Sequence, residues 1–227
     1  MIGIRTTPGG PVIPTLARVV RGLLVLFWAV PGVLLSDIAL ALDMAWRHFG
    51  FAPTIVAAAS LVLGVSELRH FHPRERVWRQ ALHRTLLLAL MLLALSPMPV
   101  WWSRAPDERF FANGMVLLVF AGLAFLVSLN DALRRLAAML PDETLRAETR
   151  FFTTLNTTFL LALGAGVVVW LTLRLHPPTA SWAVLLRWIL ESTRPWLLIM
   201  VLLLPVALTM TLLWKIKGVI LQSVFRE

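Results

Sequence analysis

Long apolar runs alternate with short clusters of charged residues along the whole chain. A helix needs roughly 20 mostly apolar residues to cross about 30 Å of hydrocarbon, and six runs reach or approach that length. We expect spanning helices at 16–42, 51–68, 85–102, 110–130, 151–173 and 196–214. The pattern therefore predicts an all-α fold, a polytopic transmembrane helical bundle that forms a single domain over residues 1–227.

The segment 180–192 has a different pattern from these six runs. It is too short to span a bilayer, and it carries Arg187 and Glu191 among its apolar residues. Trp182 and Trp188 fit the headgroup level, where indole rings are favoured. We expect a short helix lying in the membrane interface, with a re-entrant hairpin as the alternative.

The basic residues between the runs predict an orientation. Threaded through six spans, fifteen Lys and Arg residues fall on the side that holds both termini, and six fall on the other side. Cytoplasmic connections of membrane proteins are the ones enriched in Lys and Arg. The sequence therefore predicts that both termini are cytoplasmic.

Composition supports lipid as the main solvent. Hydrophobic residues make up 59% of the 227 residues, charged residues 15%, and the mean hydropathy is +0.80. A soluble fold of this size could not hide so much apolar surface. The net charge of +9 then indicates contact with anionic headgroups rather than with nucleic acid. The preference for Arg over Lys suggests a bacterial genome, and hence the inner membrane.

A cytoplasmic hairpin is expected at 131–150, where helices on both sides of Pro141 extend past the bilayer. It carries an apolar stripe of Leu133, Leu136, Leu140 and Leu145. One interpretation is that the two arms pack on each other. The other is that the stripe docks a cytoplasmic partner.

Apart from Arg18 and Arg21 at the beginning of the first run and Glu67 at the end of the second, Asp37 is the one ionisable residue expected inside the apolar runs. Charge is expensive in hydrocarbon, so such a residue is a default candidate for function. The simpler interpretation places it near the outer interface, solvated or paired with a neighbour such as Arg47. A proton or ion site is the alternative.

Uncharged polar residues gather in the cytoplasmic halves of the fourth and fifth runs. Asn130 lies at the same predicted depth as Asn156 and Thr157. Hydrogen bonds between helices would explain them, each worth about 1 kcal/mol. A pocket for a substrate or lipid is the alternative interpretation.

Small residues four positions apart allow membrane helices to approach closely. Ser60 and Gly64 have this spacing in the second run, and Ala162 and Gly166 have it in the fifth. We expect these residues to pack against other helices, either within the bundle or in another membrane subunit.

Residues that would carry enzymatic or cofactor chemistry do not form a recognisable pattern. The chain has no cysteine, its five histidines fall at helix ends or in connections, and no phosphate-binding loop is present. We therefore expect no catalytic residue, no metal and no cofactor. The sequence favours a non-catalytic membrane subunit within a larger assembly. A permease or transporter component for a neutral or lipidic substrate is the alternative.

Overall fold

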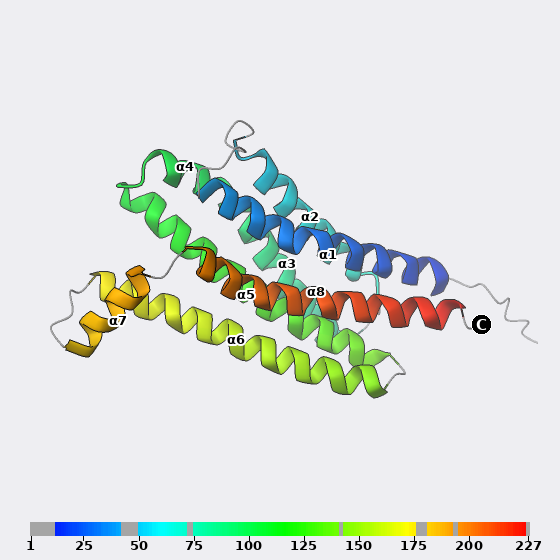
Figure 1. The fold of residues 1–227 in the computed structure, drawn as a ribbon. Helices are drawn as coiled ribbons and strands as arrows, with labels where there is room; N and C mark the ends of the chain where they lie inside the picture. The colour runs from blue at the N-terminus through cyan, green and yellow to red at the C-terminus, as the bar shows by residue number, and fades with distance from the viewer. Residues whose placement is uncertain are drawn as a thin grey trace, which may run out of the picture.

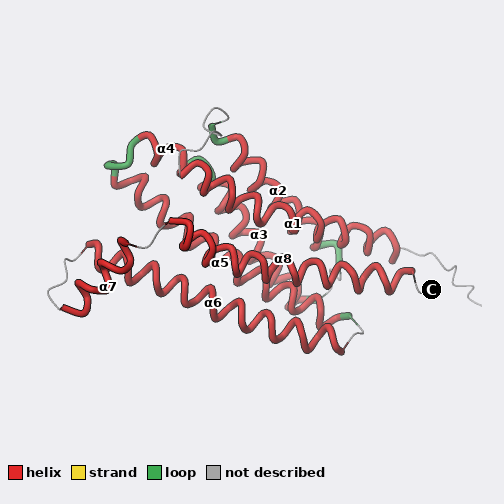
Figure 2. Tube along the Cα trace, in the orientation of Figure 1, coloured by secondary structure: helices red, strands yellow, loops and turns green. Residues whose placement is uncertain are grey.

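The computed structural model describes residues 12–41, 50–71, 75–140, 143–175, 181–192 and 195–225. Within these ranges the chain is helical and has no strand (Figure 2). The helices are α1 (Val12–Ala41), α2 (Ala52–Leu68), α3 (Arg76–Leu95), α4 (Met98–Arg104), α5 (Arg109–Met139), α6 (Glu143–Leu175), α7 (Ser181–Ser192) and α8 (Pro195–Phe225).

Five stretches of the described chain are long and apolar enough to cross a membrane. They lie in α1, α5, α6 and α8 and in the α3–α4 region. The sixth predicted span, α2, is apolar but has only 17 residues. At 1.5 Å per residue it extends about 26 Å, slightly less than the hydrocarbon core. The prediction of a helical membrane bundle is confirmed, with one helix shorter than the rest.

The long helices lie side by side along one common direction (Figure 1). α1 pairs with α2 on one side of the bundle, and α6 lies on the opposite side. α5 contacts α3, α6 and α8, while α8 joins α1 to α6. The beginning of α1 and the end of α8 lie at the same end of the bundle (Figure 1).

The third predicted span differs from the observed helix at both ends. α3 begins at Arg76 and ends at Leu95, and a turn at Ser96 and Pro97 precedes the short helix α4. Proline has no backbone N–H to continue a helix, so Pro97 and Pro99 separate the two segments. The Ser96 carbonyl accepts a hydrogen bond from Thr54 Oγ1 at 3.1 Å, which ties this turn to α2.

The hairpin at 131–150 has the predicted long arms, because α5 runs on to Met139 and α6 starts at Glu143. Arg146 joins the arms by donating hydrogen bonds to the carbonyls of Ala138 and Leu140. Leu133, Leu136 and Leu140 are buried in the core of the chain. These three leucines are therefore covered within the chain, and the side chain of Leu145 lies outside the described part. Docking of a cytoplasmic partner at the hairpin stays a prediction.

α7 is a helix as predicted, over Ser181–Ser192. Val184, Leu185 and Trp188 are each more than half exposed and share one face of it. The side chains of Trp182, Arg187 and Glu191 lie outside the described residues. An uncovered apolar face suits a helix in the membrane interface, and that location stays a prediction.

Candidate functional site

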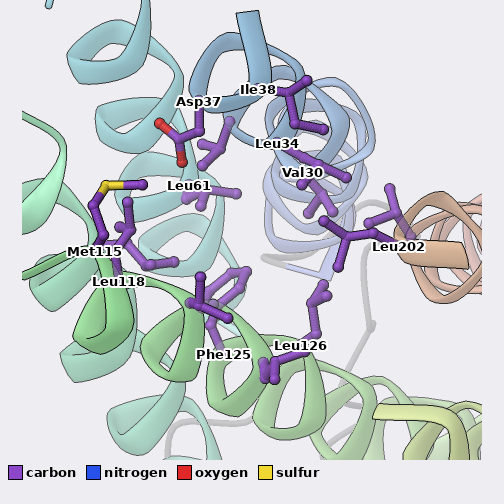
Figure 3. Close-up of a pocket in the computed structure, with 16 residues that line it drawn as sticks. Val30, Leu34, Asp37, Ile38, Leu61, Met115, Leu118, Phe125, Leu126 and Leu202 are labelled. Carbon is purple, nitrogen blue, oxygen red and sulfur yellow. The ribbon is translucent and has the colours of Figure 1, made fainter. Parts of the chain in front are cut away.

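A cavity lies between helices of the bundle, and Asp37 is at one end of it (Figure 3). Its volume is about 220 Å³, and its walls come from α1, α2, α3, α5 and α8. Of the sixteen described residues that line it, Asp37 alone has a polar side chain. The cavity therefore combines a long apolar wall with a single carboxyl group.

Asp37 is half-buried near the end of α1, so its solvation at the outer interface stays a prediction. Its Oδ1 atom is buried and has no hydrogen-bond partner in the described part of the chain. Arg47, the suggested partner, lies outside the described residues. A polar atom removed from water without a partner costs about 1–3 kcal/mol, so the carboxyl group can gain from a ligand that supplies a donor.

The cavity is elongated along the helices. Its lining residues on α5 run from Met115 to Leu126, which corresponds to about 16 Å along a helix axis. Figure 3 shows the Asp37 carboxyl group beside Met115, with Leu126 farther along the cavity. Gly122 is part of the wall, and a Cβ atom built there would meet nothing within 4 Å.

Asn130 and Asn156 come together at a second position, where α5, α6 and α8 meet. Each donates one hydrogen bond from Nδ2 to Thr209 Oγ1, at 3.0 and 2.9 Å respectively. Asn130 also donates to the Leu126 carbonyl, and Asn156 to that of Pro205. Thr209 in turn donates to the Pro205 carbonyl at 2.8 Å. We call Asn130, Asn156 and Thr209 the polar node.

The hydrogen-bonding capacities of the polar node fix the orientation of both amides. The two carbonyls only accept, and Thr209 has already used its single hydrogen. Each asparagine must therefore present its nitrogen to these groups, which leaves both Oδ1 atoms buried without a partner. All three side chains are 0% exposed.

Of the three polar residues predicted to lie together, the structure brings Asn130 and Asn156 into contact with one shared partner. Thr157 is half-buried and takes no part in the polar node. The essential third member, Thr209, was missed by the sequence argument, although a hydroxyl four residues after Pro205 in an apolar run was a usable signal. None of the described cavities is lined by Asn130, Asn156 or Thr209. Their contacts support the interpretation as interhelical hydrogen bonds.

Gly64 lies at a close crossing of α1 and α2, as a packing residue should. A Cβ atom at Gly64 would stand 2.7 Å from Leu26 Cγ, and one at Gly22 would stand 2.9 Å from the Gly64 carbonyl oxygen. Gly22 was not predicted. Ser60 lines an outer groove between α1 and α2, and its hydroxyl group donates to the Val56 carbonyl.

Ala162 and Gly166 lie on an exposed face of α6 instead of a helix contact within the chain. A Cβ atom at Gly166 would meet nothing within 4 Å. In the described structure, this pair therefore does not pack against another helix of the bundle. Packing against another subunit stays a prediction.

In the described ranges, no three His, Asp or Glu side chains lie close enough together to hold a metal ion. Comparisons with protein-family models, curated proteins and solved structures find no match to this chain. The helices and their apolar surfaces alone define the class. The protein is a multi-pass integral membrane protein built as a helical bundle.

Proposed function

We propose that the chain is a non-catalytic membrane subunit that packs within a larger membrane assembly. The observation that carries this proposal is the exposure of α6. Only 6% of its most apolar stretch is buried within the chain, against 28–39% for the other four candidate spans. The small residues Ala162 and Gly166 lie on this uncovered side. Lipid tails do not require small residues, whereas a close helix partner does.

Bulky substitutions on α6 test the assembly. Ala162→Trp places an indole on the exposed small-residue face, and it is expected to separate the assembly while leaving the chain folded. Leu63→Trp is the matched control, because Leu63 is exposed on α2 at the far side of the bundle. Native mass spectrometry after extraction in a mild detergent measures the mass of each complex.

The assembly proposal predicts a wild-type mass above that of one chain, retained by Leu63→Trp and reduced by Ala162→Trp. A wild-type chain that is monomeric at every expression level contradicts it. Equal behaviour of the two variants also contradicts it, because the α6 face would then have no special role.

A second candidate function is a permease or transporter component for a neutral or lipidic substrate. The apolar cavity at Asp37 favours it, because ligand sites in helical bundles are commonly formed between the helices. The cavity extends toward the polar node as far as Leu126 and Val206, although neither Asn156 nor Thr157 lines it. For either function we propose residence in a bacterial inner membrane with both termini cytoplasmic, as the distribution of Lys and Arg favours.

A further inference from the structure

We propose that the Asp37 cavity binds a single-chain amphiphile with an ammonium head, its alkyl chain along the apolar wall and its head on the carboxyl group. This ligand, like the substrate of the second candidate function, is lipid-like. Its binding does not depend on transport or on assembly with other chains.

The shape of the cavity selects the apolar part of the ligand. A cavity of about 150 Å³ lined by Leu, Ile and Phe holds benzene, and sites for drug-sized ligands begin near 300 Å³. At about 220 Å³ and about 16 Å long, this cavity fits one extended chain better than a two-tailed lipid or a broad ring system.

The position of Asp37 selects the polar part. The carboxyl group stands at one end of the slot, beside Met115, and its buried Oδ1 has no partner in the described residues. Val30, Leu34 and Leu126, farther along the wall, offer no hydrogen-bond donor. A half-buried carboxylate whose Oδ1 atom has no partner gains most from a cation that also donates hydrogen bonds, and an ammonium group does both.

The depth of Asp37 agrees with an amphiphile arriving from the bilayer. Asp37 is four residues from the end of α1, so it lies about 6 Å from that end along the axis. Met115 is near the beginning of α5, at the same end of the bundle. The head of the ligand would thus lie toward the membrane surface and its chain toward the membrane centre, which is how amphiphiles are oriented in a bilayer.

Decylamine is a suitable probe, with decanol as the neutral probe of matched length. The wild-type chain is purified in a steroid-tailed detergent, because a rigid fused-ring tail imitates an extended alkyl chain less than other detergent tails do. Native mass spectrometry counts bound probe, and the shift of the thermal unfolding temperature with concentration gives the apparent affinity. We expect one saturable decylamine per chain, bound at least tenfold more tightly than decanol.

Two variants separate the contributions of head and chain. Asp37→Asn keeps the shape of the carboxyl group without its charge, so it should lose the tenfold preference for decylamine while still binding decanol. Gly122→Leu places a side chain in the open space of the cavity and should lose both probes. Gly166→Leu makes the same substitution on exposed α6, where there is also open space, and should bind as the wild type does.

The proposal is overturned if decylamine shows no saturable binding to the wild-type chain, or if Gly122→Leu binds it as tightly as Gly166→Leu. An equal affinity of decylamine and decanol for the wild type also overturns it, because Asp37 would then not select the head. These readouts use the isolated chain, so their failure is distinct from failure of the assembly experiment on α6.

Discussion

The hydroxyl group of Thr209 is shared by Asn130 and Asn156, and it therefore couples α8 to both α5 and α6. It accepts two hydrogen bonds and donates one, so its full capacity is used. Both asparagines are fully buried, and neither amide can turn to water if this partner is lost. The polar node is therefore sensitive to a change of a few atoms.

Thr209→Val keeps the volume of the side chain and removes the acceptor. We expect the free energy of unfolding to fall by about 1–2 kcal/mol, because two buried N–H groups each lose a partner. Thr211→Val is the control. Thr211 is exposed on the same helix, and within the described residues its hydroxyl group bonds the Ala207 carbonyl of its own helix, so the change should alter stability by less than about 0.5 kcal/mol. Unfolding in mixed micelles measures both, and equal effects would contradict a special role for the polar node.

Not every buried polar residue of the bundle could be predicted from the sequence. Asn130 and Asn156 stood out because amides are rare in apolar runs, and both are buried as interhelical contacts require. Thr209 did not stand out, because α8 is apolar all round and no stripe indicates which side faces the bundle. The surroundings of Asp37 could not be predicted either, since they depend on residues from five helices.

At the scale of the helices, the pair α1 and α2 is held close by two glycines that face each other. Gly22 meets backbone and Gly64 meets mainly the side chain of Leu26, so the two positions are not equivalent. A side chain can shift by a rotamer, whereas a backbone carbonyl moves only with its helix.

Gly22→Ala should therefore lower the free energy of unfolding by about 1–3 kcal/mol. Gly64→Ala should lower it less, by about 1 kcal/mol. Gly166→Ala provides the control, because its Cβ atom enters open space and the gain in helix propensity is up to about 1 kcal/mol. Thermal unfolding of the three variants gives their order. Greater destabilisation by Gly166→Ala than by Gly22→Ala would contradict the close crossing.

The elements themselves were largely predictable, and their ends less so. Apolar run length identified α1, α5, α6 and α8, because a bilayer imposes a minimum length on its helices. It says little about where a helix stops outside the membrane, and α8 runs on to Phe225, well past the predicted end at 214. Prolines mark the break between α3 and α4, which run length alone did not separate.

For the whole molecule, the charge distribution predicts which side of the membrane each loop occupies. The chain contains no cysteine, so a single introduced thiol is the only target of a maleimide. Exposed residues are available at Asp107, between α4 and α5, and at Glu75 and Gln222 near the opposite end.

In intact bacterial cells, a membrane-impermeant maleimide should label Asp107→Cys. It should label Glu75→Cys and Gln222→Cys only after the membrane is permeabilised, because these positions are on the predicted cytoplasmic side. The reverse pattern would mean that the bundle is inserted upside down. Labelling of Glu75→Cys and Asp107→Cys from the same side would mean that the chain does not cross the membrane between them.

Pro205 has a mechanical consequence for the bundle. It has no N–H group, so the carbonyl of Val201 cannot receive the usual helical hydrogen bond at this turn of α8. Leu202, within this weakened turn, and Val206, just after it, both line the cavity. Thr209, one turn later, is anchored to two other helices. Pro205 is therefore the point at which α8 can bend most easily, and a bend there would move Leu202 in the cavity wall relative to the anchored Thr209.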